Sequence, residues 1–112
     1  MPPPIGFLRM LLGIAVLAAL PSWAANRALL VGVTAYPGLA PNQQLRGPAN
    51  DVALMREILE RKNFDPIHIR VLADQVPQAG APTHGNILAA LDRLANEVKA
   101  GDFVYLHFSG HG

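Results

Sequence analysis

The sequence predicts an α/β domain built on a mostly parallel sheet, and two observations support this prediction. Apolar runs typical of buried strands alternate along the chain with segments whose apolar residues recur every three to four positions. Loops that contain Pro and Gly separate these segments. The order strand, helix, strand, helix, strand is typical of right-handed crossovers that return to a parallel sheet.

Three strands are expected. The first covers Arg27 to Tyr36 and begins with consecutive apolar residues, which is the pattern of a strand covered on both faces. The second, Ile67 to Leu72, alternates in character and is therefore expected nearer a sheet edge. The third, Phe103 to Phe108, is apolar and aromatic and runs directly into the sequence Ser-Gly-His-Gly.

Two amphipathic helices are expected between these strands. The first begins at Asn50 or Asp51, either of which would cap it, and Asn63 would suit its end. The second follows Thr83 as its cap, and Gly101 is expected to stop it. In both segments the apolar residues form one stripe, so each helix is expected to bury one face against the sheet.

The overall composition excludes several classes of protein. Of the 112 residues, 51% are apolar and 15% are charged, with ten Gly, ten Pro and no Cys, which excludes collagen, coiled coils and disordered charged tails. Nine Lys and Arg against eight Asp and Glu give a net charge of +1 without a basic run, so no nucleic-acid partner is expected. Without Cys, the chain carries no disulfide, no thiolate metal site and no cysteine nucleophile.

Residues 1–24 have the features of a cleaved secretory signal peptide. One cation precedes an apolar run over residues 10–20, which is too short to span a bilayer because spanning takes about 20 residues. Small residues three and one positions before Ala25 suit cleavage at that point. We therefore expect residues 25–112 to belong to a secreted or periplasmic protein. An uncleaved anchor helix is the alternative, and membrane contact would come only through this segment.

Chemistry is expected at the carboxyl ends of the strands, where open parallel sheets place their sites. Two loops meet this condition: one carries Asn50 and Asp51, and the other contains Ser109 and His111. Glycines on both sides of His111 allow unusual backbone torsions and leave its imidazole accessible. This histidine is therefore suited to accept a proton near neutral pH.

The residues themselves leave alternatives open. His111 would also suit an ordinary surface histidine, and Asp51 would suit a helix-capping carboxylate. His107 and His111 have the spacing of a helical zinc pair, but the residues between them are strand and Gly-rich loop. Ser109 lacks the flanking glycines of a serine-hydrolase nucleophile. A flavodoxin-like or response-regulator-like module is another alternative, although the phosphate loop and paired acidic residues of such folds are not visible.

Taken in order, the segments resemble the first half of a caspase-like cysteine peptidase domain, closest to the metacaspase and bacterial caspase-like branch. The resemblance covers Arg27 to Gly112. It is carried by RALLVGVTAY, by LRGPANDV leading into the first helix, by THGNILAALDRL, and by the last strand running into SGHG. It implies a caspase-like three-layer sandwich with a mostly parallel sheet, of which this sequence is the part up to the third strand.

The resemblance also implies roles for four residues. His111 matches the catalytic histidine, which works with a cysteine thiolate on the loop after the next strand. Gly112 matches the residue whose N–H helps to hold the oxyanion. Asp51 and Ser109 match residues that line the S1 pocket, where a carboxylate would select Arg or Lys at the cleaved bond of a polypeptide substrate. Pro48 stands where many metacaspases have Cys.

The nucleophile of such a peptidase is missing from this sequence. The family's cysteine follows its histidine by about 50 residues, whereas this chain has one residue after His111. We therefore expect a fragment of a cysteine endopeptidase that is inactive alone, with a non-catalytic interaction module or pseudo-enzyme as the alternative. No metal or cofactor is expected, and calcium activation stays open. An apolar strand left at a sheet edge also predicts poor solubility.

Overall fold

The structure, a computed structural model, describes residues 24–111. The predicted signal peptide falls almost wholly outside this range, as does the candidate residue Gly112. The signal peptide and the secreted or periplasmic location therefore stay predictions. Within residues 24–111, no helix is both long enough and apolar enough to cross a membrane.

Three strands form one parallel sheet, as the sequence predicts. They are β1 (Asn26–Gly32), β2 (Ile69–Ala73) and β3 (Phe103–Ser109), and their order in the sheet is β2-β1-β3. β1 is therefore central, and the expected edge position of β2 is confirmed. The carboxyl ends of all three strands meet at one end of the sheet because the strands are parallel.

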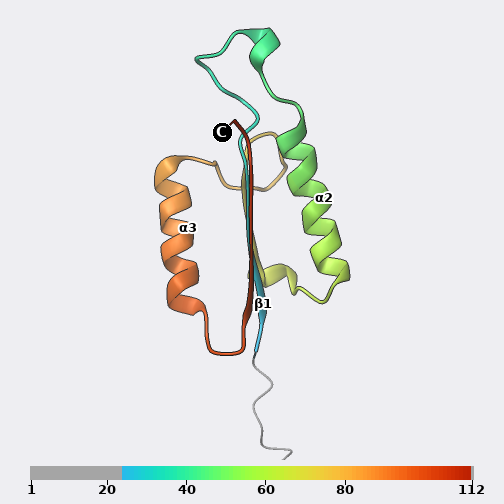
Figure 1. The fold of residues 1–112 in the computed structure, drawn as a ribbon, viewed down its shortest axis with the longest axis vertical. Coiled ribbons are helices and arrows are strands. Elements are labelled where there is room, and N and C mark those ends of the chain that lie inside the picture. The colour runs from blue at the N-terminus through green and yellow to red at the C-terminus, as the bar shows by residue number, and fades with distance from the viewer. Residues whose placement is uncertain (1–23, 112) are drawn as a thin grey trace, which may run out of the picture.

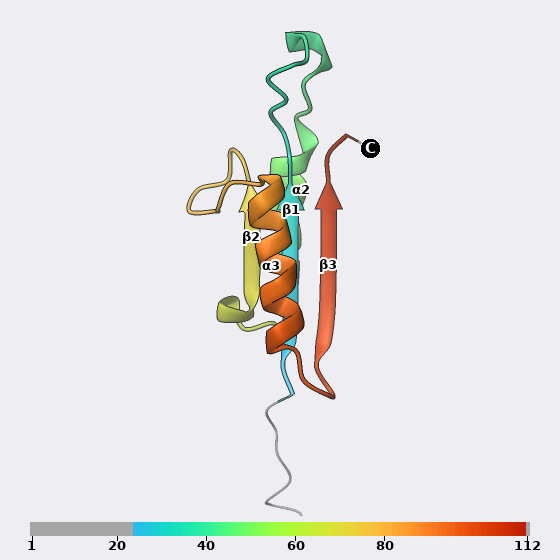
Figure 2. The same cartoon turned by 90° about the vertical axis from the view of Figure 1, so that its left-hand side faces the viewer.

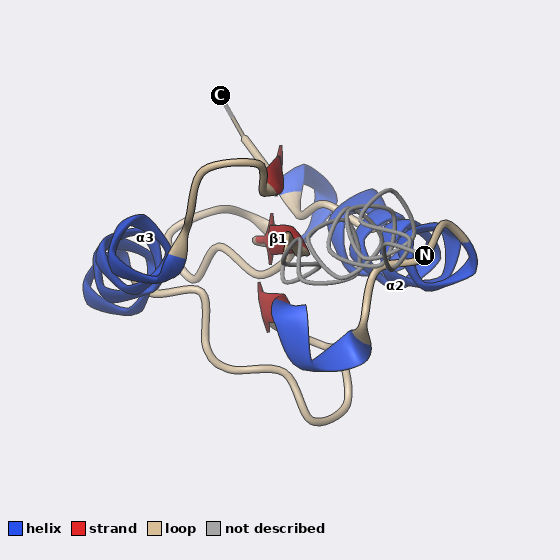
Figure 3. Cartoon of the chain, turned by 90° about the horizontal axis from the view of Figure 1, so that it is seen from below, coloured by secondary structure: helices blue, strands red, loops and turns tan. Residues whose placement is uncertain are grey.

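Two helices cover opposite faces of this sheet and give the expected α/β three-layer arrangement. α2 (Gly47–Arg61) lies on one side of β1 and α3 (His84–Glu97) on the other, as Figure 1 and the end-on view of Figure 3 show. Two short 3-10 turns, η1 (Pro41–Gln43) and η2 (Pro66–His68), lie in the connections. The chain thus alternates between strands and helices, and each helix returns it to the same sheet.

The core consists of two apolar clusters, one on each face of β1. Successive strand side chains point to opposite faces. Leu30 therefore packs in the α2 cluster with Val52, whereas Leu29 packs in the α3 cluster with Ala90. Residues 28–32 of β1 are all buried, which confirms the expectation of a strand covered on both faces.

Several predicted element boundaries are wrong. β2 begins at Ile69 instead of Ile67, because residues 66–68 form the 3-10 turn η2, in which the Ile67 N–H donates to the Asp65 carboxylate at 3.1 Å. β1 ends at Gly32 instead of Tyr36. The Val33 N–H still donates to the Ser109 carbonyl at 2.9 Å, but the N–H groups of Thr34 and Ala35 donate to the Asp74 carboxylate at 2.7 and 2.5 Å.

α2 begins at Gly47 with Arg46 at its N-cap, so neither Asn50 nor Asp51 caps it. Pro48 lies in the first turn of α2. Proline is well tolerated there, because the N–H groups of the first turn have no partner within the helix and the lack of one costs nothing.

Other boundaries follow the sequence closely. Thr83 caps α3 as predicted, with its hydroxyl accepting the N–H of Asn86 at 3.2 Å. Asn63 follows the end of α2 with φ = 68°, a left-handed conformation that asparagine tolerates. The end of α3 differs from the prediction: the helix ends at Glu97 because Val98 is already extended (φ = −67°, ψ = 139°), so Gly101 does not stop it and lies instead in the turn that leads into β3.

β3 is the second edge of the sheet, and one of its faces is open. Figure 2 shows α3 in front of β1 and β2, with β3 standing beside it. Val104, Leu106 and Phe108 belong to the face on which α3 lies, and their exposed fractions are 36%, 47% and 55%. This is the open apolar strand that the sequence led us to expect, and the poor solubility that it implies stays a prediction.

Candidate active site

The two loops expected to carry chemistry meet at the carboxyl end of the sheet. The hydroxyl of Ser109, the last residue of β3, donates to the Oδ2 atom of Asp51 on α2 at 3.2 Å. These residues are 58 positions apart in sequence, so only the fold brings them together. The structure thus places the two predicted substrate-binding residues side by side, and their role stays a prediction.

A glycine at the end of β1 allows this meeting. Gly32 pairs with Ser109 across the sheet. A Cβ atom on Gly32 would lie 2.7 Å from Cγ2 of Val52 and 3.0 Å from the Pro48 carbonyl oxygen, so any side chain would push α2 away. The first turn of α2 therefore rests directly on the end of β1, and this contact brings Asp51 within reach of Ser109.

His111 lies in the loop after β3 with an exposed side chain. Its Nε2 atom is 3.2 Å from the carbonyl oxygen of Gln43 in η1, and its backbone N–H donates to the hydroxyl of Tyr36 at 2.7 Å. We assign the imidazole proton to Nε2, because only a protonated nitrogen donates to a carbonyl. This assignment leaves Nδ1 with a lone pair, which is what a proton acceptor requires.

The reason for glycine before His111 differs from the one expected. Gly101 is the one glycine with positive φ among the described residues, so Gly110 does not adopt an unusual torsion. Instead, a Cβ atom on Gly110 would lie 2.6 Å from the Tyr36 hydroxyl oxygen and 3.5 Å from the Val33 carbonyl oxygen. Gly110 is therefore required for space, because the loop after β1 crosses directly over it.

The loop after β1 is fixed by residues for which the sequence predicts no role. Thr34 is buried, and its hydroxyl accepts the N–H of Ala49 in α2 at 3.1 Å. Asp74 accepts two N–H groups of the same loop, and Gln44 binds the backbone of Tyr36. Asp74 directly follows β2 at this edge, a position that could have identified it. The non-periodic loop over residues 39–48 offers no such signal for Gln44.

The zinc interpretation gains no support from this geometry. His107 lies on β3 with a buried Nε2 atom that has no hydrogen-bond partner among the described residues, whereas His111 faces η1. Within residues 24–111, no three His, Cys, Asp or Glu side chains lie close enough together to hold a metal ion.

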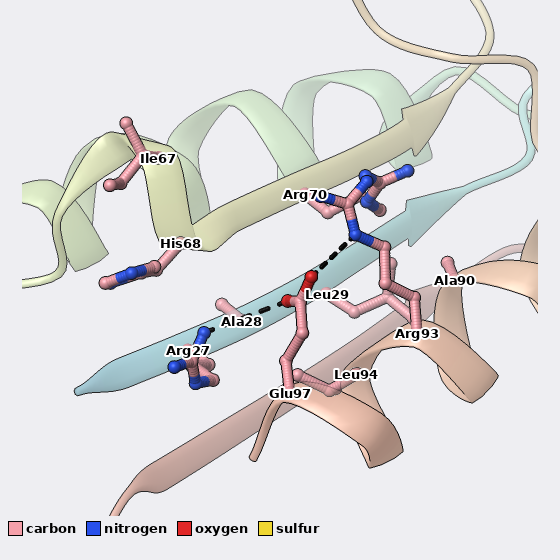
Figure 4. A pocket seen from close by; sticks show the side chains of 10 residues that line it. All are labelled: Arg27, Ala28, Leu29, Ile67, His68, Arg70, Ala90, Arg93, Leu94 and Glu97. Atoms are coloured by element: carbon pink, nitrogen blue, oxygen red, sulfur yellow. Dashed lines mark hydrogen bonds and ion pairs between the residues drawn. The ribbon is translucent and has the colours of Figure 1, made fainter. Parts of the chain in front are cut away.

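A small cavity lies at the opposite end of the strands. It measures about 50 Å³ and gathers three guanidinium groups that are far apart in sequence, those of Arg27, Arg70 and Arg93 (Figure 4). Glu97 pairs with two of them, at 3.8 Å from Arg27 and 2.7 Å from Arg93. The hydrogen bond from Arg93, followed by the charges of the arginines, lowers the pKa of Glu97. These ion pairs link α3 to the start of β1, far from His111.

Comparison with known proteins agrees with the geometry of the site. The family model "Metacaspase, peptidase C14 domain" matches residues 26–112, a range that contains the whole sheet and both loops of the site. The chain belongs to the metacaspase family. Its caspase-like fold is therefore established, and the predicted resemblance is confirmed.

Several metacaspases share this segment. Metacaspase-7 of Arabidopsis thaliana is 42% identical over 89 residues, which are 79% of this chain and 21% of that protein. Metacaspase-1 of Candida albicans is 35% identical over 88 residues, 78% of this chain and 19% of that protein. A protein named inactive metacaspase-4, from Trypanosoma brucei brucei, is 37% identical over 91 residues, 79% of this chain and 25% of that protein. The chain thus spans about a fifth to a quarter of the length of these relatives.

Proposed function

We propose that this metacaspase segment supplies the histidine half of a cysteine endopeptidase site, with His111 as the catalytic base and acid. The observation that carries this proposal is the hydrogen bond between Ser109 and Asp51, because it brings both predicted loops together beside an exposed His111. The nucleophile would be a cysteine outside this segment, since the segment contains none.

The proposed mechanism uses the two imidazole nitrogens differently. Nε2–H stays bonded to the Gln43 carbonyl, which orients the ring, while Nδ1 takes the proton of the cysteine thiol. The thiolate attacks the scissile carbonyl carbon, and Nδ1 then returns the proton to the departing amine. Water hydrolyses the resulting acyl-enzyme. The N–H of Gly112 is proposed to help hold the oxyanion.

We propose that the substrate is a polypeptide with Arg or Lys at the cleaved bond. The Asp51 carboxylate is exposed, and the Ser109 hydroxyl holds one of its oxygens at 3.2 Å. A fixed, accessible carboxylate favours a guanidinium or ammonium group over a neutral or acidic one. Asp51 and Ser109 would therefore favour substrates with a basic side chain at the cleaved bond.

A chimaera tests the proposal, with residues 26–112 replacing the matching segment of Arabidopsis metacaspase-7. We expect it to cleave peptides after Arg or Lys, and His111→Ala to lower kcat/KM by about 10³-fold or more because the proton acceptor is lost. The exposed His84→Ala, on α3, is the matched control and should change little. Asp51→Asn should weaken the preference for basic peptides without abolishing cleavage. Full activity in His111→Ala would contradict the proposal.

A second candidate, a non-catalytic metacaspase-like module, is favoured by similarity to a relative whose name calls it inactive. The same chimaera separates the two candidates. Residues 26–112 of a catalytic chain should support cleavage, because they carry the proposed catalytic histidine and the proposed S1 residues. A folded chimaera that cleaves no peptide, beside an active parent enzyme, would favour the non-catalytic module.

A further inference from the structure

Tyr36 touches His111 in two ways at once. Its hydroxyl oxygen accepts the backbone N–H of His111 at 2.7 Å. Its ring meets the imidazole edge to face, with the ring centroids 4.7 Å apart and the planes at 74°. Edge-to-face contacts between rings have a preferred orientation, so this contact acts on the plane of the imidazole as well as on its position.

Tyr36 is itself held by a neighbouring side chain. Its backbone N–H donates to Oε1 of Gln44 at 2.7 Å, and Nε2 of Gln44 donates to the carbonyl oxygens of Tyr36 and Leu39 at 2.6 and 3.0 Å. Gln44 directly follows Gln43, whose carbonyl faces His111 Nε2. The loop over residues 36–44 therefore contacts the backbone, the imidazole ring and the Nε2 atom of the same histidine.

The space around this contact has no slack. A Cβ atom at position 110 would lie 2.6 Å from the Tyr36 hydroxyl oxygen, closer than real Cβ contacts come. Position 110 therefore requires glycine, because a larger residue would displace either the Tyr36 hydroxyl or the chain that leads into His111.

We infer that Tyr36 is a positioning residue for His111. The hydroxyl fixes the main chain of His111, and the contact between the two rings fixes the imidazole plane. Together they hold Nε2 on the Gln43 carbonyl and leave Nδ1 free for the thiol proton. This inference rests on the proposed function for its catalytic consequence, since the geometry acts on the same imidazole. Small misplacements of a reacting group cost large factors in rate, so a residue of this kind affects turnover more than binding.

The chain itself provides the first test, which needs no activity. We expect the backbone N–H and the Nε2 proton of His111 to exchange with solvent more slowly than those of a free histidine, because each is hydrogen-bonded, and to show contacts to the Tyr36 ring. Tyr36→Phe keeps the ring but removes the acceptor for the His111 N–H, so both the backbone N–H and the Nε2 proton should exchange faster. Tyr105→Phe, at the other tyrosine of the chain, is the matched control and should leave both signals unchanged. Equal protection in Tyr36→Phe and the wild type would overturn the inference.

The chimaera with metacaspase-7 provides the second test. Tyr36→Phe should lower kcat by about tenfold and leave KM unchanged, as expected for the loss of one orienting hydrogen bond. Tyr36→Leu, which also removes the aromatic ring, should lower kcat further. If His111→Ala strongly lowered kcat/KM but both Tyr36 variants kept a kcat within twofold of the wild type, the positioning role would be overturned. If His111→Ala kept full activity, the proposed function would fail instead. The NMR experiment would still test the position of the His111 ring, because it does not depend on activity.

Discussion

The strands β1 and β3 have the same length and a similar apolar content, yet different interactions hold them. β1 is central, with a strand on each side and a helix on each face, and residues 28–32 are buried. β3 is an edge strand in which no residue is fully buried. Apolar content alone therefore does not determine how far a strand is buried, because its neighbours in the sheet decide that.

β3 is instead anchored by polar contacts at both ends. At its start, the carboxylate of Asp102 accepts the N–H groups of Ala25 and Lys99 and pairs with Arg27 at 2.9 Å. At its end, Ser109 binds Asp51, and the loop beyond it binds Tyr36. The end that carries the candidate site is thus fixed by directional bonds, which set atomic positions more strictly than apolar contact does.

The largest difference between the two strands should appear when an apolar side chain is shortened. Leu30→Ala in β1 removes a leucine with no exposed surface and should lower the free energy of unfolding by about 3 kcal/mol, because a cavity remains. Leu106→Ala in β3, where the leucine is 47% exposed, should cost about 1 kcal/mol or less. Urea unfolding followed by circular dichroism measures both. Equal losses would mean that β3 contributes as much burial as β1.

The Asp102 contacts at the start of β3 should make the stability of the fold sensitive to acid. The Ala25 N–H, the Arg27 guanidinium and the Lys99 N–H lower the pKa of Asp102 from its ordinary 3.8 to about 2. A lowered pKa in the folded state stabilises the fold above pH 3.8, and this contribution is lost as the pH falls from there through about 2. The urea midpoint of the wild type should therefore fall across this window.

Asp102→Asn isolates that contribution from those of other carboxylates. The variant should be less stable than the wild type at neutral pH, and the difference between them should shrink as the pH falls from 4 to 2. Asp92→Asn, at an exposed carboxylate on α3, serves as the control and should follow the wild type. A constant difference between Asp102→Asn and the wild type across this range would show that the anchor does not depend on charge.

Much of the fold could be predicted from the sequence because it depends on apolar periodicity. The unbroken apolar run of β1 and the helical stripe of α3 record which faces are buried, and the structure confirms both. The end of β1 and the start of α2 were predicted wrongly, because contacts without a periodic sequence signal set both boundaries. Asp74, 40 residues further along the chain, accepts the N–H of Thr34. Pro48 lies in the first turn of α2, which begins at Gly47, before the predicted Asn50.

The candidate site could be predicted only in part. Asp51, Ser109 and His111 were identified because the ends of parallel strands meet at one edge of the sheet. Tyr36 and Gln44 were not, because their contacts arise in a loop without periodicity and depend on the exact path of the backbone. Sequence patterns thus indicate which elements meet, whereas the orientation of a side chain at the meeting point requires coordinates.

The open edge of β3 should also make the chain self-associate. Within residues 24–111 no strand pairs with its outer backbone groups, and Val104, Leu106 and Phe108 are exposed beside them, which favours pairing between copies. Leu106→Lys places a charge on this edge and should raise the dissociation constant of the associated form by about tenfold or more, a change of about 1.4 kcal/mol. Light scattering over a dilution series measures this.

Leu54→Lys provides the matched control for that edge. Leu54 is 59% exposed, more than Leu106, but it lies on α2, where the backbone groups are already bonded within the helix. If apolar exposure alone drove association, Leu54→Lys would weaken it at least as much as Leu106→Lys. We expect only the change in β3 to act, because association by strand pairing requires free backbone N–H and C=O groups as well as apolar surface. A monomeric wild-type chain with sharp NMR signals at all concentrations would contradict the prediction.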